Sequence, residues 1–364
     1  MRFKLAALAV SVLACALVLW PPRPARNDLR ITFIDVGQAD AILIQTPRGH
    51  AIMIDTGGRL ERNESGDGGS MAESVGEKVV VPFLIRQGIH HVDAILLTHP
   101  HGDHVGGIAP IIRMLGADVF FDGGQRYAGH AYRDALDEAR KHHVRVIAPR
   151  AGDVWHTDDG VRLRFLTGSG TPIDDPVDGV NENSLVAMLE CDCGRPRPFR
   201  ALFMGDAGKL SEDILLAQRA DLRADVLKAG HHGSRFASSP AFLAAVGARD
   251  GVISDGRHNL YHHPAPETLQ HLLDAHMRIW RTDLCGAVTL SVYGARTNRW
   301  RAAASTACVL NGSETSVCDS HAADASSWCA DPGRPDSPLG MTIPPASQLP
   351  TSHTARKLWP ANGS

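Results

Sequence analysis

Short apolar, β-rich runs alternate along the chain with segments of helical spacing. Residues 29–47 and 50–58 are two β-rich runs on either side of a short Pro-Arg-Gly turn, which predicts a hairpin that opens a sheet. Residues 71–89 have helix-compatible spacing, with Gly88 as a stop. The centre of 92–99 is a continuous apolar run of strand length, typical of a strand buried on both faces.

From residue 99 to about 293, strand-like and helix-like segments keep alternating, and the strands outnumber the helices. Hairpins mixed with crossover helices predict an α/β sandwich with its sheets inside and its helices outside. A chain of 364 residues with 43% hydrophobic content can build one domain of this kind with further segments at its ends. We therefore expect a folded domain over 28–301, between a leader at 1–27 and a low-complexity, disordered tail at 302–364.

The leader has the pattern of an export signal. Arg2 and Lys4 precede an apolar run of 16 residues, 5–20. The run is long for a signal-peptide core and short for a membrane span, so a cleaved signal and a retained membrane anchor both stay open. We expect an exported protein that is periplasmic, secreted or anchored to the outer face of the inner membrane.

Seven cysteines suit an exported chain that forms disulfides, although their pairing cannot be derived from the sequence. The pair Cys191-Asp-Cys193 has no second cysteine pair at zinc spacing, so we interpret it as part of a turn between strands.

The formal net charge of −3 excludes a global positive field that would attract nucleic acid or an anionic membrane surface. Any contact with a polyanion must therefore be local. Five arginines could form only a small patch, and a solvated surface is the favoured interpretation of them: Arg235, Arg257, Arg296, Arg299 and Arg301.

The stretch LTHPHGDHVGG, residues 97–107, gathers metal-ligand side chains directly after the predicted buried strand. Neutral imidazoles and a carboxylate are the ligands that first-row divalent ions prefer, and glycines let the backbone turn tightly around them. We expect His99 and His101 to face one ion, and Asp103 and His104 to face a neighbouring ion. A polar loop with incidental histidines is the disfavoured alternative.

This loop resembles the signature of the metallo-β-lactamase-like hydrolases. Over residues 29–293 the chain is similar, in the order and style of its motifs, to the metallo-β-lactamase-like domain of the ComEC competence-protein family, as a stand-alone, exported relative. The resemblance implies an αββα four-layer sandwich with two divalent metal ions at the sheet edges. The motifs that carry it are FIDVGQADAILI, MIDTGG, THPHGDHVGG, NENSLVAML, LFMGD, LKAGHHGS and the stretch from ISDGRHNLYHHP to WRTDLCGAVTL.

The resemblance assigns further metal-side roles. Asp206 stands where similar enzymes have the aspartate that bridges the two metals, although a strand-terminal aspartate can also cap the following helix. One of His231 and His232 is expected to bind metal and the other to face the substrate, with His232 as the favoured ligand. Asp55, at the end of a predicted strand, either orients a ligand histidine or the bound water from behind, or only forms a turn before Gly57.

Four residues are predicted on the substrate side, besides the second histidine of the pair. His263 precedes a proline and a helix N-terminus that would favour an anion, and Asn259 lies just upstream. Ser234 could donate to a phosphate, although a plain Gly-Ser turn is the favoured interpretation. Asn183 belongs to a segment shared with the ComEC-type branch. We expect Asp103, His232 and His263 to be the catalytic residues.

Two departures affect the choice of metal. Many β-lactamase-like relatives carry another metal-binding histidine before the bridging aspartate, whereas this chain has Asn181 and Asn183 there, which would leave the second ion less fully coordinated. His101 stands where membrane-embedded competence proteins commonly have aspartate. That makes the site more zinc-like, with manganese as the alternative.

Two ions about 3.5–4 Å apart would convert a bridging water to hydroxide near neutral pH, and this serves phosphodiesters, esters and amides alike. We expect a metal-dependent hydrolase, in first place a phosphodiesterase or nuclease acting on DNA or another phosphodiester. The alternative is an exported esterase or phosphoesterase for a small-molecule or cell-envelope substrate. β-Lactam hydrolysis and a noncatalytic binding module rank lower, and no protein partner is evident.

Overall fold

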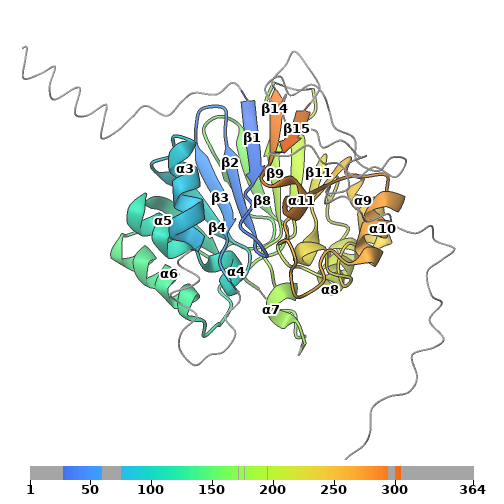
Figure 1. Ribbon diagram of the computed structural model, residues 1–364, viewed down its shortest axis with the longest axis horizontal. Coiled ribbons are helices and arrows are strands. Elements are labelled where there is room, and N and C mark those ends of the chain that lie inside the picture. The colour runs from blue at the N-terminus through green and yellow to red at the C-terminus, as the bar shows by residue number, and fades with distance from the viewer. Residues whose placement is uncertain are drawn as a thin grey trace, which may run out of the picture. The chain divides into compact units, whose positions relative to one another are not determined.

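The computed structural model describes residues 28–59, 75–170, 172–175, 177–194, 196–293 and 300–304 (Figure 1). The predicted leader and all of the predicted tail beyond Ala304 lie outside these residues. Within the described ranges, no helix has the length and apolar character needed to cross a bilayer.

The first sheet has eight strands in the order β15-β14-β1-β2-β3-β4-β5-β6. Neighbours from β15 to β3 are antiparallel, whereas β3 to β6 run parallel. Its strands are β1 (Asp28–Phe33), β2 (Ala41–Gln45), β3 (Ala51–Thr56), β4 (Val92–Leu97), β5 (Ala117–Asp122), β6 (Arg145–Ile147), β14 (Val288–Tyr293) and β15 (Trp300–Ala304).

The second sheet has seven strands in the order β13-β12-β11-β10-β9-β8-β7. Strands β7 to β10 form antiparallel pairs, and β10 to β13 run parallel. Its strands are β7 (Val154–His156), β8 (Val161–Phe165), β9 (Ala187–Cys191), β10 (Phe199–Phe203), β11 (Val226–Lys228), β12 (Asp250–Ile253) and β13 (Arg278–Arg281).

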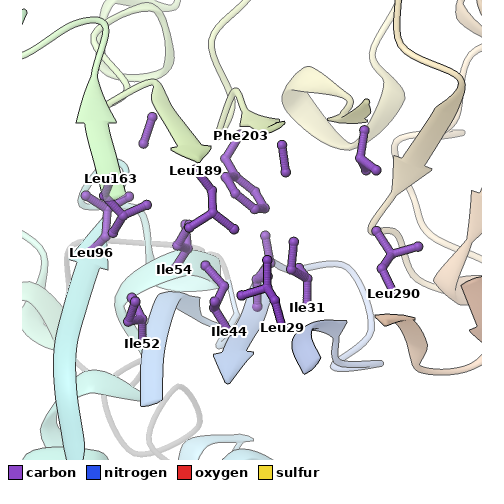
Figure 2. Close-up of a cluster of buried hydrophobic side chains, with 14 of the residues drawn as sticks. Leu29, Ile31, Ile44, Ile52, Ile54, Leu96, Leu163, Leu189, Phe203 and Leu290 are labelled. Atoms are coloured by element: carbon purple, nitrogen blue, oxygen red, sulfur yellow. The ribbon is translucent and has the colours of Figure 1, made fainter. Parts of the chain in front are cut away.

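Three hydrophobic cores define four layers. The central core joins the inner faces of both sheets, and Figure 2 shows side chains of the first sheet, such as Ile44 and Leu96, facing Leu163 and Phe203 of the second. A second core packs the outer face of the first sheet against α3 (Val81–Arg86), α5 (Ile108–Met114) and α6 (His130–Lys141). A third packs the second sheet against α8 (Lys209–Ala217), α9 (Pro240–Val246) and α10 (Pro266–Asp274). The predicted αββα sandwich is confirmed.

Local predictions fared differently. The hairpin across Pro47-Arg48-Gly49 forms between β2 and β3, and all six residues of β4 are buried, as predicted. The β-rich run 29–47 contains two strands, β1 and β2, which are separated by residues 34–40. In the predicted helix 71–89, the described part contains a π-helical turn, η1 (Gly76–Val80), followed by α3. Gly88 has a φ of 76°, a left-handed conformation typical of a helix stop.

The turn predicted at Cys191-Asp-Cys193 joins β9 to β10, and these two cysteines form a disulfide.

Parallel strands place their carboxyl ends at one edge of a sheet. In the first sheet β3 and β4 end at this edge, and in the second sheet β10, β11 and β12 do so. Short helices follow directly: α4 (Gly102–Val105) after β4, and a 3₁₀ turn, η2 (Gly230–Gly233), after β11. Another short helix, α7 (Gly179–Glu182), precedes β9, and α11 (Thr282–Cys285) follows β13. Loops at this edge therefore bring the sequence motifs of both halves together.

Candidate metal centre

The loop after β4 carries four of the predicted ligands. His99 and Asp103 are buried, and α4 begins between them, so that His104 follows Asp103 in one helical turn. This turn packs tightly against β3. A Cβ atom at Gly107 would lie 2.3 Å from the carbonyl oxygen of Thr56, so only glycine fits at this close approach.

Asp55 holds this loop from behind. Its carboxylate accepts hydrogen bonds from the backbone N–H of Thr98 (2.8 Å) and from the Thr98 hydroxyl (2.7 Å). Its Oδ2 also lies 2.8 Å from Nδ1 of His104. With Nδ1–H of His104 donating a hydrogen bond to this carboxylate, Nε2 carries the free lone pair of the ring. The Thr98 hydroxyl, which donates to Asp55, lies 3.1 Å from Nδ1 of His99 and can accept a hydrogen bond from its N–H.

The second sheet contributes Asp206. It follows β10 after Met204 and Gly205, and the residue at 205 must be glycine, because its φ is +56° and a Cβ would lie 2.7 Å from Cβ of Thr98. Asp206 is 2% exposed. The close approach of Gly205 to Thr98 places the Asp206 carboxylate opposite the loop after β4.

His231 and His232 lie in η2, and both have positive φ values, 47° and 52°. This costly conformation is held by hydrogen bonds from the His231 N–H to Gly205 O and from the Ser234 N–H to His231 O. The imidazole rings of these two successive residues have different surroundings. Nδ1 of His232 donates to the carbonyl oxygen of Ser254 at 2.8 Å, which leaves its Nε2 free, whereas His231 is partly exposed.

These side chains converge on one carboxylate oxygen. Oδ2 of Asp206 lies 3.4 Å from Nε2 of His104 and 3.5 Å from Nε2 of His232. Ligand atoms of Asp103, His104, Asp206 and His232 all lie within 4.8 Å of one another. One atom of each has no hydrogen-bond partner although it is buried: Asp103 Oδ1, His104 Nε2, Asp206 Oδ1 and His232 Nε2. These four buried oxygen and nitrogen atoms without hydrogen-bond partners are suited to bind a divalent metal ion.

A second position lies beside the first. Nε2 of His99 is 3.9 Å from Oδ2 of Asp206 and 3.0 Å from Nδ1 of His101. Asn181 approaches from α7, its Nδ2 lying 3.4 Å from Nε2 of His231, and its buried Oδ1 has no hydrogen-bond partner. Asp206 thus lies between two groups of potential metal ligands. The amide of Asn181 lies near the group with fewer ligands, which contains His99 and His101.

The electrostatics of the cluster favour cations at its centre. Burial acts to lower the pKa of His104, but Asp206, Asp55 and Asp103 outweigh it and hold this pKa well above its usual value. Burial also acts to lower the pKa of His232, but the nearby carboxylates of Asp206 and Asp40 raise it to about 9. Burial lowers the pKa of His99, which is flanked by other histidines. The negative potential that favours protons on two of these rings would also favour a divalent ion.

The predicted substrate-side residues have varied surroundings. His263 lies next to the cluster, its ring centroid 5.7 Å from that of His231, and burial with the two nearby histidines lowers its pKa to about 4. Asn259 instead braces the loop around His263, since its amide accepts from the His263 N–H and donates to the His263 carbonyl. The Ser234 hydroxyl accepts from the Phe236 N–H within its own turn.

Asn183 is likewise committed to the backbone. Its side chain donates to the carbonyl oxygens of Ile173 and Gly179 and accepts from the Ile173 N–H. The structure therefore gives Asn183 and Asn259 hydrogen-bond partners within loops, and the substrate contact predicted for them stays a prediction.

A pocket of about 850 Å³ opens beside His101. Glycines and polar residues dominate its lining, which includes one arginine and two carboxylates: Gly124, Arg126, Ser169, Asp175, Asp178 and Asn183. Its charged side chains are thus net negative.

Two buried charges at the site were missed from the sequence. Asp40, before β2, and Lys228, at the end of β11, are each 1% exposed and form an ion pair beneath the cluster. Asp40 directly precedes the apolar run AILI in FIDVGQADAILI, and Lys228 directly follows Val226 and Leu227 in ADVLKAG. A buried charge at the end of a strand needs a partner, and that signal could have identified both residues.

Comparison with known proteins identifies the family. Residues 34–256 match the metallo-beta-lactamase superfamily. ComE operon protein 3 of Bacillus subtilis (strain 168) is 31% identical over 265 residues, which cover 72% of this chain and 33% of that protein. Competence protein ComA of Neisseria gonorrhoeae is 28% identical over 282 residues, covering 77% of this chain and 35% of that protein. The chain thus spans about a third of the length of these relatives.

Solved structures are more distant. CmlA, a diiron beta-hydroxylase from Streptomyces venezuelae, is 13% identical with a TM-score of 0.45, over 74% of this chain and 54% of that chain. A diphosphatase from the PhnP family is 15% identical with a TM-score of 0.38, over 69% of this chain and 94% of that chain. The family match and the competence-protein relatives confirm the predicted resemblance, and the chain belongs to the metallo-β-lactamase superfamily.

Proposed function

We propose that the chain is a metal-dependent hydrolase that cleaves phosphodiesters, with DNA as the first substrate to test. The observation that carries this proposal is the position of Asp206 Oδ2, which lies 3.4–3.9 Å from Nε2 of four histidines: His99, His104, His231 and His232. Such a shared carboxylate between two groups of donors is suited to a pair of divalent ions.

Asp103, His104 and His232 would hold one ion, and His99 and His101 the other, with Asp206 shared between them. We propose Zn²⁺, because imidazoles outnumber carboxylates, with Mn²⁺ as the alternative. Such ions supply Lewis acidity and lower the pKa of a bound water, so that it can attack at neutral pH.

His231 and His263 would contact the substrate. Both rings lie at the border of the cluster, 5.7 Å apart, and Nδ1 of each is without a hydrogen-bond partner among the described residues. A neutral imidazole carries one N–H donor, and the lowered pKa of His263 keeps its ring neutral near pH 7. The two rings could therefore donate to non-bridging phosphate oxygens or to the leaving oxygen.

A second candidate, an esterase or phosphoesterase for small substrates, is favoured by the pocket beside His101. A volume of about 850 Å³ suits a small ligand, and Asp175 and Asp178 would repel a polyanion that entered it. We further propose that the leader exports the chain, either for release or for attachment to the membrane.

Hydrolysis assays test the proposal directly. Purified full-length chain, loaded with Zn²⁺ or with Mn²⁺, is incubated with linear single- and double-stranded DNA, a bis-aryl phosphodiester, an aryl phosphomonoester, an aryl ester and a chromogenic cephalosporin. We expect cleavage of the phosphodiesters and its loss in Asp103→Ala. Cleavage of the monoester or ester alone would favour the second candidate, and identical rates in wild type and Asp103→Ala for every substrate would refute both.

A further inference from the structure

The floor of the metal centre contains a buried ammonium group. Lys228 is the last residue of β11, and its Nζ forms an ion pair with Asp40 Oδ2 and donates to Gly205 O at 3.1 Å. Both charged side chains are 1% exposed. Burying a lysine costs several kcal/mol unless a charge compensates it. The ion pair links the first sheet, through Asp40, to the second, through Lys228.

Asp40 lies directly behind the metal-facing histidines. One of its oxygens is 3.8 Å from Nδ1 of His104 and the other is 3.8 Å from Nδ1 of His232. Its backbone N–H donates to the carbonyl of Asp103. Apart from the ion pair with Lys228, neither carboxylate oxygen has a hydrogen-bond partner in the described part of the chain. Asp40 thus contacts the cluster without contributing one of its four convergent ligand atoms.

Lys228 also contacts the backbone that presents Asp206. Gly205 O accepts both from Nζ of Lys228 and from the backbone N–H of His231. The lysine therefore holds its charge at a defined place, one residue from Asp206 and opposite Asp40. Lys228 is the one buried lysine among the described residues. Four buried carboxylates face it or the cluster: Asp40, Asp55, Asp103 and Asp206.

We propose that the Asp40–Lys228 pair tunes the divalent-metal affinity of the centre. Asp40 strengthens cation binding through its charge behind His104 and His232, and Lys228 opposes it through a fixed positive charge. Each added negative charge near an ion also reduces the Lewis acidity of that ion, so the lysine would keep bound ions reactive at some loss of affinity. Lys228 and Asp40 are thus positioning residues, and this role rests on the proposed metal-dependent function.

Opposite effects of the two single substitutions distinguish this role from a structural one. Lys228→Met keeps the length of the side chain and removes its charge, so the dissociation constant for Zn²⁺ should fall by about tenfold. Asp40→Asn keeps the shape and leaves the ammonium uncompensated, so the dissociation constant should rise by about tenfold. Asp40→Asn combined with Lys228→Met should return to within about threefold of wild type.

Zn²⁺ dissociation constants are measured on the full chain by competition with a chromogenic chelator, with folding checked by circular dichroism. Lys141→Met, at the exposed end of α6, is the matched control and should leave the constant unchanged. The proposal is overturned if both single variants shift the constant in the same direction, or if neither shifts it while folded. If Lys228→Met does not fold, Asp40→Asn decides, since an unchanged or tighter constant there contradicts the proposal.

No substrate enters this measurement, so its outcome is separable from that of the hydrolysis assays. A wild-type chain that binds Zn²⁺ and cleaves no phosphodiester would refute the proposed function and leave the tuning testable. A chain that cleaves phosphodiesters without the opposite shifts would refute the tuning alone.

Discussion

Hydrogen bonds on the outer side of each imidazole ring determine which nitrogen faces Asp206. His104 is bonded through Nδ1 to Asp55, and His232 through Nδ1 to the carbonyl of Ser254, so both present Nε2 to the cluster. Within the described ranges His231 has no such carbonyl partner, and its Nδ1 lies 3.6 Å from Oδ2 of the partly exposed Asp178. The adjacent histidines therefore differ in how firmly their rings are oriented, and this difference separates a metal ligand from a substrate contact.

Alanine substitution of each histidine tests that separation. His232→Ala should lose bound metal and reduce the rate of phosphodiester cleavage by at least about a hundredfold, because one of four convergent ligands disappears. His231→Ala should keep its metal and lose rate through weaker contact with the substrate. Metal content is measured by mass spectrometry on dialysed protein. Equal metal loss in both variants, or greater loss in His231→Ala, would contradict the assignment.

The N-termini of two helices are capped by glutamate side chains from other helices. At the start of α8, Glu182 of α7 accepts from the backbone N–H of Ser211 at 2.8 Å, and it thereby anchors the turn that carries Asn181. At the start of α9, Glu212 accepts from the backbone N–H groups of Ser238 and Ser239. Such tertiary caps satisfy the free N–H groups of a helix and connect helix position to the site.

Glu212 should make stability depend on pH. Burial raises its pKa to about 7, above the ordinary value of 4.5, so the folded state binds this proton more tightly than the unfolded state does. Its contribution is therefore present in full at low pH and is lost as pH rises through about 7, amounting to on the order of 3 kcal/mol.

Urea unfolding of wild type and Glu212→Gln, in excess chelator from pH 5 to pH 8, measures this contribution. Wild type should lose more unfolding free energy than the variant over this range. The difference between the two proteins removes the effect of every other titrating group. Parallel pH profiles would show that Glu212 does not titrate in the folded protein with a raised pKa.

The two sheets meet both in the central core and at the metal centre. Asp55 and His104 belong to the first sheet and its loops, whereas Asp206 and His232 follow strands of the second. In the core, Phe203 of β10 packs against Phe33 of β1, with ring centroids 6.3 Å apart. Phe203 also lies three residues before Asp206, so packing of the core and placement of the shared carboxylate depend on the same strand.

Metal should therefore stabilise the whole domain. An ion bound by both halves favours the folded state by about 4 kcal/mol at a thousandfold excess over its dissociation constant, or about 10 °C in Tm for a domain of this size. Differential scanning fluorimetry with and without a chelator measures this shift. Asp206→Ala should show little shift, and a wild-type Tm that is insensitive to the chelator would contradict a bridging ion.

The central core should tolerate truncation poorly. Phe203→Ala should lower the free energy of unfolding by about 3–5 kcal/mol, because the cavity lies between two sheets that cannot readily collapse into it. Phe236, which is 67% exposed, is the matched control, and Phe236→Ala should change stability by less than about 0.5 kcal/mol. Urea unfolding at constant pH measures both, and equal losses would place the two side chains in similar surroundings.

Sequence patterns predicted the strands, the helices and the ligand residue types, because each of these depends on residues that are close together in the chain. The alternation of strand and helix signals was sufficient for an α/β sandwich, the resemblance of the motifs implied its αββα layers, and Asp103-His104 follows a buried strand as the loop motif indicated. A motif does not report whether a polar side chain bonds to its own loop. Asn183 and Asn259 have residue types that suit substrate binding, and only the path of the backbone around them shows that their amides are already bonded.

The sequence by itself indicated an α/β sandwich through its periodicity, and the chemical types of the candidate ligands through short contiguous motifs. The superfamily and its αββα layers followed from the resemblance of those motifs to a known family. The tertiary structure alone decided that Nε2 of His232 faces Asp206, and that Asp40 and Lys228 meet as an ion pair beneath the centre. Both contacts join residues that are far apart in the chain, and the ion pair of Asp40 with Lys228 also joins the two sheets. Their geometry depends on how two sheets pack, which no local pattern of residues encodes.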